Sequence, residues 1–199
     1  MEFQEVVRKR KMVRDLLPTA IPREVVERII ANAQRGPSSG YTQGFEFLIF
    51  NGPEDTSRLW KNVTNPTAKG AESAPLIIVP VAHSKAYVKR YLEPDRADVG
   101  RKTEEDFPAP YWYIDAAFAS MLALLTAVDS GLGAFYFSIG PTSAHIPSFR
   151  EAFGIPEEYY PIGAIAIGYP TESVPSPSTR QSWRTRRRPK SEMIHLGKW

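Results

Sequence analysis

The sequence predicts a single domain of the α+β class, in which helices cover a sheet that is buried on both faces. The chain has 199 residues, a length that suits one domain. Candidate helices and strands are mixed along the chain, which favours one layered unit. The last candidate strand, residues 161–169, carries small or apolar residues at both its odd and its even positions. A strand with this pattern has no solvent-exposed face, so the sheet is expected to lie between two layers of helices.

Two helices are expected before residue 37. Phe3, Val6 and Val7 have helical spacing and predict a short helix over residues 2–11. Pro22 suits the first turn of a second helix, which ends near residues 35–37. The apolar stripe of this helix is typical of a core face and consists of Val25, Val26, Ile29, Ile30 and Ala33.

The next segments alternate between strands and helices. Residues 45–50 form a short apolar run that suits a strand, and residues 55–62 suit a brief helix. A second strand over residues 76–79 follows Ala74-Pro75 and is apolar throughout. Residues 84–110 are polar and contain prolines, so we expect a mobile or lid-like excursion there.

Residues 111–130 form the best candidate helix of the chain. Ala, Leu and Met cover most of its faces, which is typical of a central helix or a helix at a subunit interface, and Gly131 ends it. The elements expected after it are a strand over 134–137, a helix over 147–154 and the strand over 161–169. After Pro170 the apolar periodicity stops until Met193-Ile194, which indicates an extended arm rather than a second domain.

Composition argues against several classes of protein. Apolar residues make up 42% of the chain, which supports an ordinary globular core. The sequence has no cysteine, and its three histidines have no metal-ligand spacing, so we expect neither disulfides nor a metal site. No apolar run approaches the roughly 20 residues that a membrane span needs, and residues 1–5 lack a signal-peptide layout. A cytoplasmic location with no membrane contact is therefore expected.

Basic residues crowd both ends of the chain. The first cluster is Arg8, Lys9, Arg10, Lys11 and Arg14, and the second is Arg180, Arg184, Arg186, Arg187, Arg188 and Lys190. Such clusters can be solvated surface, can bind nucleic acid, or can converge on the phosphate of a small anionic cofactor through guanidinium contacts. Composition alone does not choose among these interpretations.

The common catalytic motifs are missing. The sequence contains neither a phosphate-binding GxxxxGK[ST] loop nor a GxSxG elbow, and Gly131-Leu132-Gly133 ends a helix where a dinucleotide motif would open one. Asp115 is explained by its place near a helix N-terminus. Without an evident acid, base or nucleophile set, the chemistry is expected to come from a cofactor. Residues 111–113, Tyr-Trp-Tyr, suit either a substrate pocket or ordinary packing.

Two segments can bind such a cofactor. One is Arg10-Lys11-Met12-Val13-Arg14, and the other is Gly36-Pro37-Ser38-Ser39-Gly40-Tyr41-Thr42-Gln43, where turn-forming residues offer backbone N–H groups and hydroxyls. The first resembles the R-R-S-x-R signature of the nitroreductase family, and the second resembles its P-S-x-x-N-x-Q loop. Further matches run in order through Ala74-Pro75, Asp115, residues 131–133, residues 154–157, residues 167–170 and residues 187–189.

The resemblance implies a nitroreductase-like fold with a mostly antiparallel central sheet, and a homodimer with FMN at its interface. Residues 1–169 would form the FMN-binding domain, and residues 170–199 its C-terminal arm over the partner subunit. The residues implied at FMN are Arg10, Lys11, Met12, Arg14, Pro37, Ser38, Ser39, Gln43, Tyr136, Phe137, Ile139, Gly140, Arg186, Arg187 and Arg188. Ser138 is the implied catalytic residue, as a hydrogen-bond donor to flavin N5.

The activity that the resemblance implies is ping-pong hydride transfer from NADH or NADPH to a nitroaromatic, a quinone or a similar electrophile. The partners expected are small-molecule substrates, and no nucleic acid. Dehalogenation, flavin-consuming synthesis of a cobalamin ligand, and flavin binding without turnover remain open on the same fold. The chain departs from the family pattern at Met12 (usually Ser), Tyr41 (usually Asn) and Gly44 (usually Pro).

Overall fold

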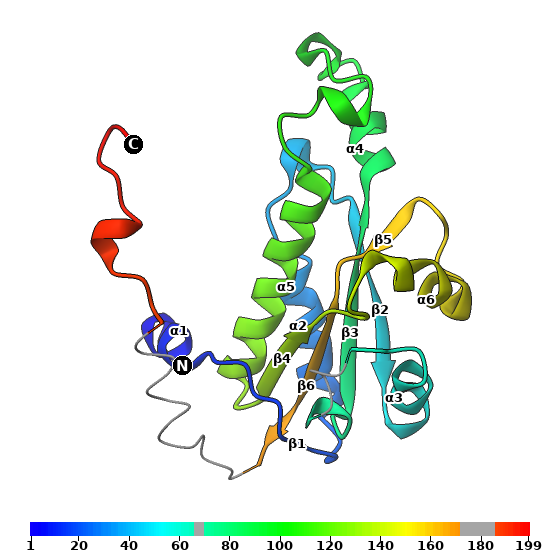
Figure 1. Ribbon diagram of the computed structural model, residues 1–199, viewed down its shortest axis with the longest axis vertical. Helices are drawn as coiled ribbons and strands as arrows, with labels where there is room; N and C mark the ends of the chain where they lie inside the picture. The colour runs from blue at the N-terminus through cyan, green and yellow to red at the C-terminus, as the bar shows by residue number, and fades with distance from the viewer. Residues whose placement is uncertain (66–69, 172–185) are drawn as a thin grey trace.

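The computed structural model describes residues 1–65, 70–171 and 186–199. Within these ranges the chain forms a three-layer α+β unit, with a sheet between two sets of helices (Figure 1). The α-helices are α1 (Phe3–Lys9), α2 (Arg23–Ala33), α3 (Pro53–Trp60), α4 (Ser84–Tyr91), α5 (Tyr111–Asp129) and α6 (Ile146–Phe153). The strands are β1 (Leu16–Leu17), β2 (Phe45–Asn51), β3 (Leu76–His83), β4 (Gly133–Phe137), β5 (Tyr159–Pro161) and β6 (Ala164–Pro170).

The sheet is antiparallel at every pairing between these strands. Its main order is β1-β6-β3-β2, with β4 paired to β6 and β5 paired to β3. In the register of the two central strands, Ile77 lies opposite Ala166. The predicted α+β class and the mostly antiparallel sheet are therefore confirmed.

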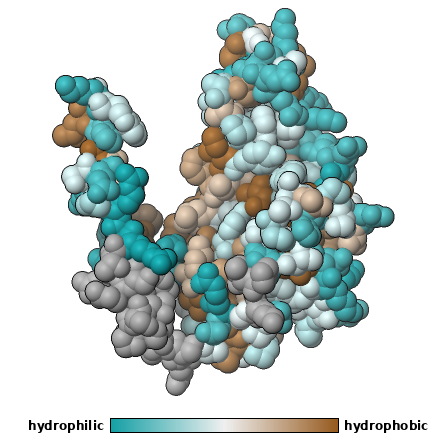
Figure 2. Space-filling model, in the orientation of Figure 1, coloured by the Kyte–Doolittle hydropathy of each residue, from teal (hydrophilic) through white to brown (hydrophobic). Residues whose placement is uncertain are grey.

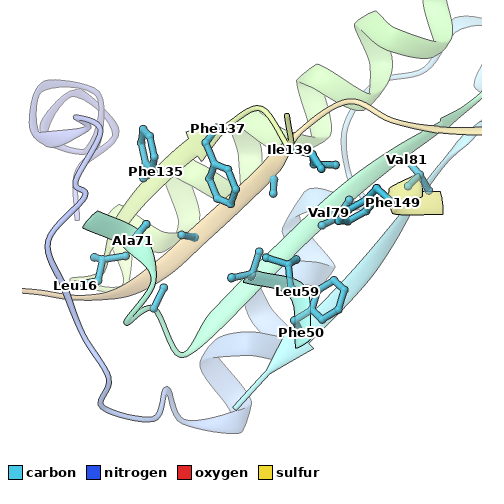
Figure 3. Close-up of a cluster of buried hydrophobic side chains, with 14 residues drawn as sticks. Leu16, Phe50, Leu59, Ala71, Val79, Val81, Phe135, Phe137, Ile139 and Phe149 are labelled. Atoms are coloured by element: carbon cyan, nitrogen blue, oxygen red, sulfur yellow. The ribbon is translucent and has the colours of Figure 1, made fainter. Parts of the chain in front are cut away.

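Alternation along the central strands supplies a separate core to each face. On one face Ile77 and Val79 pack with Leu59 of α3 and Phe149 of α6, in the cluster that Figure 3 shows. On the other face Leu76, Ile78, Ile165 and Ile167 pack against apolar side chains of α2 and α5. Burial of apolar side chains on both faces is the main stabilising contribution to the fold, at about 25 cal/mol per Å² of apolar surface. The pattern of residues 161–169 predicted this double covering.

Three segments differ from the elements that the sequence predicts. The first helix ends at Lys9, short of residue 11, and the strand expected over residues 161–169 is divided into β5 and β6. Gly163 lies at this division with φ +150°, a conformation that L side chains rarely adopt. The polar excursion over residues 84–110 begins with α4, whose Tyr87 is fully buried, and therefore belongs partly to the core.

Helix α5 is both a core element and an exposed one. Contrary to the expectation from the sequence that no apolar run is long enough, α5 has the length and apolar composition of a membrane span. Half of it is buried inside the protein, against α2 and the sheet. Phe118 and Met121, by contrast, are nearly half exposed. Figure 2 shows apolar side chains gathered along the side of the body where α5 lies.

Residues 186–199 stand apart from the sheet, on the side of α1 (Figure 1). Every residue of this segment is exposed, including Leu196 and Trp199. Its side-chain contacts with other described residues lie within the segment, such as the stacking of His195 on Trp199 at 4.3 Å between ring centroids. This exposed segment is the described part of the predicted C-terminal arm; Arg180 and Arg184 of the second basic cluster lie outside the described residues.

Candidate functional site

The N-terminal basic segment is fixed beside β4. The Val13 amide donates to the Ala134 carbonyl at 2.9 Å, and Met12 forms a parallel bridge with Ala134. This contact is close because position 133 is glycine: a Cβ there would lie 2.9 Å from a methyl carbon of Val13. The pairing holds residues 10–14 along the strand that leads to Ser138, so the structure brings two of the predicted groups together.

The cations of this segment are available to an anion. Among the described residues, no ion pair involves Arg10, Lys11 or Arg14, whereas the adjacent Lys9 pairs with Glu5 at 2.6 Å. The Arg14 guanidinium lies over the ring of Phe135, 4.1 Å from its centroid. Three positive charges within five residues therefore lack a carboxylate partner, and guanidinium groups suit a phosphate dianion.

The end of β4 presents one side chain outward and keeps its neighbours inside. Phe137 and Ile139 are almost completely buried in the core that faces α3 and α6, and Gly140 is buried as well. Ser138 between them is exposed. A ligand at this edge would therefore meet the Ser138 hydroxyl and not the side chains of Phe137 or Ile139.

Tyr136 lies two residues before Ser138 in the sequence. It is half-buried, on the face of the sheet that packs against α2 and α5. Its hydroxyl donates to the Ile162 carbonyl, and burial raises the pKa of this phenol above its usual value. Its amide lies 3.4 Å from the Met12 sulfur. Met12, which replaces the usual serine, therefore packs its side chain against β4.

Asn65 contacts Ser138 directly, and no motif in the sequence pointed to it. Its side-chain amide donates to the Ser138 carbonyl at 2.9 Å and to the Ser138 hydroxyl at 2.7 Å. The two residues are 73 positions apart, so the contact arises from tertiary packing. The adjacent Thr64 amide donates to the Ile139 carbonyl at 3.0 Å. Residues 64–65 thus hold the backbone on which Ser138 stands.

The serine loop after α2 is held at the start of α5. The Ser39 amide donates to Asp115 at 2.8 Å, and the hydroxyls of Ser39 and Tyr91 lie 2.9 Å apart. The Ser38 hydroxyl accepts a hydrogen bond from the Gln43 amide at 2.9 Å. Pro37 and Gln43 are exposed. No hydrogen bond between described residues links this loop to the Ser138 edge.

Two residues of this loop adopt the left-handed conformation. Tyr41 has φ +54° and Gln43 has φ +52°, which is uncommon for residues other than glycine. Such conformations persist where the surroundings fix them, often at ligand sites. Here the fixing contacts include the hydrogen bond from Arg90 Nε to the Gly40 carbonyl at 3.0 Å. Tyr41, which replaces the usual asparagine, is 78% exposed on this loop.

Gly44 departs from the family pattern for a steric reason. A Cβ at this position would lie 2.3 Å from the ring of Tyr87, so no side chain, and no proline, can occupy it. The Tyr87 hydroxyl donates to Asp115 at 2.7 Å. Burial and this hydrogen bond raise the pKa of Tyr87 well above its usual value. The departure at Gly44 therefore belongs to the packing of α4 and not to the binding surface.

Among the described residues, no ion pair or side-chain hydrogen bond joins the C-terminal arginines to the N-terminal cluster. Arg186, Arg187 and Arg188 are exposed. Arg188 contacts Glu192 of its own segment, through Nε at 3.3 Å and through NH2 to the carbonyl at 2.8 Å. Arg186 and Arg187 form none of the ion pairs among described residues, which leaves both available to an anion.

Two cavities formed by described residues lie away from the predicted site residues. One of about 590 Å³ is lined by residues of α3 and the loop before β3, among them Trp60 and Glu72. Another of about 350 Å³ lies between α1, α2 and α5, with Phe3 and Leu122 in its lining. In the described parts of the chain, no group of His, Asp or Glu residues is arranged to hold a metal ion. The aromatic run 111–113 is divided, since Trp112 is buried and Tyr113 is exposed.

Known proteins resemble this chain over nearly its whole length. A protein of Methanothermobacter thermautotrophicus described as "Putative NADH dehydrogenase/NAD(P)H nitroreductase" is 26% identical, over 100% of this chain and 88% of its own. A nitroreductase family protein from Streptococcus pneumoniae TIGR4 superposes with a TM-score of 0.76 at 20% identity, covering 98% of this chain and 100% of that one. A structure from Exiguobacterium sibiricum 255-15, described as "a putative nitroreductase in complex with FMN", gives 0.73 at 21% identity and covers 98% and 97%.

The matching structures are only 20–21% identical in sequence to this chain, so they establish its fold alone. The sequence model of the Nitroreductase family, however, matches residues 7–169, well over half of the chain. This span contains the basic segment on β4, the serine loop after α2 and the exposed Ser138. The chain therefore belongs to the nitroreductase family.

Proposed function

We propose that this protein is an FMN-dependent NAD(P)H oxidoreductase that works as a homodimer and reduces nitroaromatics, quinones or similar electrophiles. The observation that carries the proposal is the placement of Arg10, Lys11 and Arg14 beside β4, the strand that directly precedes the exposed Ser138. None of the three cations forms an ion pair with another described residue. This arrangement offers a phosphate-binding end and a hydrogen-bond donor on one surface.

The basic segment fits the phosphate of FMN. Guanidinium groups bind phosphate oxygens through paired, charge-assisted hydrogen bonds. Arg10 is partly buried, so less of its conformational freedom remains to be lost when it binds an anion. Met12 offers no hydroxyl, so the phosphate contacts in this segment would come from the cations and from backbone amides.

Ser138 would orient the reactive end of the flavin. When bound, FMN would supply the redox chemistry between NAD(P)H and the acceptor. The protein supplies position and hydrogen bonds: the exposed hydroxyl of Ser138 can donate to a ring nitrogen, while Phe137 and Ile139 stay in the core. No side-chain base is required for the hydride step.

A second subunit would complete the site. Within one chain the loop at Ser38 and Ser39 has no hydrogen bond to the Ser138 edge, and Arg187 has none to Arg10. Loop and arm would therefore act on the partner's cofactor. The nearly half-exposed apolar side chains of α5, Phe118 and Met121, suit the interface between copies. The names of the relatives, which include NAD(P)H nitroreductase and a complex with FMN, support the same proposal.

One spectrum of the purified protein tests the proposal. Protein bearing FMN should be yellow, and anaerobic NADH or NADPH should bleach it. Addition of a nitroaromatic or a quinone should then restore the colour. A colourless protein that takes up no FMN from solution would contradict the proposal. A yellow protein that neither nucleotide bleaches would indicate flavin binding without turnover.

A further inference from the structure

We propose that Asn65 is a positioning residue that directs the hydroxyl proton of Ser138 toward the cofactor. The inference rests on the proposed function, in which Ser138 faces FMN. It starts from the two hydrogen bonds that the Asn65 side chain gives to Ser138, one to the carbonyl and one to the hydroxyl. Asn65 itself would touch the serine and not the reacting atoms.

The chemistry of the two contacts fixes the orientation of the amide. A backbone carbonyl can only accept a hydrogen bond, so the Asn65 atom 2.9 Å from it must be the NH2 nitrogen. The same nitrogen lies 2.7 Å from the Ser138 Oγ. An amide nitrogen is a donor without acceptor capacity, so Oγ must be the acceptor in this contact.

The direction of the hydroxyl proton follows from that assignment. A serine hydroxyl carries one proton and two lone pairs. Because Asn65 occupies a lone pair, the O–H bond points away from Asn65 and remains free for another acceptor. Ser138 is exposed while Phe137 and Ile139 face the core, so this free proton lies on the ligand side of the strand end.

The segment that carries Asn65 is itself held against the strand end. Trp60, the last residue of α3, stacks on Phe137 with 5.2 Å between ring centroids and an interplanar angle of 17°. Thr64 donates to the Ile139 carbonyl at 3.0 Å. Contacts to three consecutive residues, Phe137 to Ile139, therefore fix the distance between Asn65 and Ser138.

Asn65→Asp reverses the polarity of the contact with little change in shape. A carboxylate only accepts, so it would take the Ser138 proton for itself and leave the flavin without that donor. The added charge would also change the flavin potential directly. A double-mutant cycle with Ser138→Ala separates these effects, because the direct effect of the charge is the same with or without the hydroxyl.

The measurement is the midpoint reduction potential of the bound flavin in the full-length protein. Ser138→Ala should change the ratio of oxidised to reduced FMN affinity roughly tenfold, which is about 30 mV for a two-electron couple. Asn65→Asp should shift the potential by one amount in the protein with native Ser138 and by a different amount in the Ser138→Ala protein. The difference should match the Ser138→Ala effect within about twofold.

Asn62→Asp is the matched control, since the side-chain amide of Asn62 donates to the Arg58 carbonyl at 3.0 Å and to no other described residue. It should shift the potential equally with and without the Ser138 hydroxyl. Asn65→Ala provides a second, uncharged variant of the same cycle, and it should also be non-additive with Ser138→Ala. Equal shifts for both Asn65 variants in the two backgrounds, with FMN bound, would overturn the role of Asn65 alone. Failure of the unmodified protein to bind FMN would instead overturn the proposed function.

Discussion

The Tyr87 hydroxyl donates a 2.7 Å hydrogen bond to the carboxylate of Asp115, and both side chains are buried. The same carboxylate oxygen accepts the Ser39 amide at 2.8 Å. One buried group therefore joins α4, α5 and the serine loop. The ring of Tyr87 also fills the space that a side chain at Gly44 would need. The conformation of the loop after α2 thus depends on a residue of the polar excursion.

Tyr87→Phe should destabilise the protein by about 1–3 kcal/mol, the range for leaving a buried acceptor short of a donor. The ring remains, so its packing on Gly44 is kept. The free energy of unfolding in urea measures the effect. Tyr159→Phe is the matched control, because its hydroxyl bonds to Glu46 on the exposed surface, and it should cost no more than about 0.5 kcal/mol. An equal loss of unfolding free energy in the two variants would show that the buried hydrogen bond stabilises the protein no more than the exposed one.

The raised pKa of Tyr87 predicts a loss of stability in alkaline solution. Burial, and then the hydrogen bond with Asp115, raise this pKa above the value of about 10 for a free tyrosine. Above pH 10 the unfolded chain loses the tyrosine proton while the folded chain retains it, so stability falls as pH rises. Below pH 10 the contribution is complete.

The difference between the native protein and Tyr87→Phe isolates this residue from the other tyrosines. Melting temperatures measured from pH 8 to pH 11 should fall more steeply for the native protein than for the variant. Tyr136 and Tyr159, whose pKa values are also raised, contribute equally to both proteins. Parallel curves above pH 10 would show that Tyr87 titrates alike in the folded and unfolded chains.

Local patterns in the sequence were sufficient for most of the fold. The two apolar sets of residues 161–169 predicted a sheet covered on both faces, and the structure places Ala166 and Ile167 in opposite cores. Helix α4 was missed because its composition is polar, and its burial depends on the contact of Tyr87 with Asp115. Strand β1 has two residues, too few for any periodicity.

The candidate site was only partly predictable. Alternation of buried and exposed residues is a local property, and its continuation beyond β4 accounts for the exposure of Ser138 between two buried neighbours. Asn65 could not be found from the sequence, because its contact spans 73 positions and arises from the packing of α3 against Phe137.

Arg10→Ala should weaken FMN binding by at least tenfold. A hydrogen bond to a charged group contributes about 1.5–3 kcal/mol, and Arg10 lacks a carboxylate partner among the described residues. A flavin fluorescence titration gives the dissociation constant. Lys9→Ala is the control, since Lys9 already pairs with Glu5. This variant should bind FMN with the affinity of the native protein. An Arg10→Ala protein with native affinity would remove this residue from the site.

Met121→Lys should dissociate the dimer. Light scattering of the native protein should give about twice the chain mass of 22.4 kDa. A charge placed among the exposed apolar side chains of α5 would have to be desolvated at the interface. Val99→Lys, at a position of similar exposure outside α5, should leave the mass unchanged. A native monomer of 22.4 kDa that holds FMN would contradict the shared site.

Truncation after Thr171 should abolish FMN retention and weaken the dimer. The described part of the removed segment, residues 186–199, is exposed and contains no α-helix, so helix content should be almost unchanged. The two basic clusters would repel each other unless an anion lay between them. A phosphate held by Arg10, Arg14 and Arg187 would offset that repulsion. FMN at a hundredfold excess over its dissociation constant should then stabilise the full-length protein by about 2.7 kcal/mol.

Single substitutions in the full chain separate the roles within the arm. Arg187→Ala should reduce FMN affinity and spare dimerisation, because the remaining arm can still pack on the partner. Arg188→Ala should have the smaller effect on affinity, since Arg188 already bonds to Glu192 within its own segment. If the truncated protein purifies yellow with an unchanged melting temperature, the arm has no part in the site. The C-terminal arginines would then be a solvated basic tail, and the phosphate would depend on the N-terminal cluster alone.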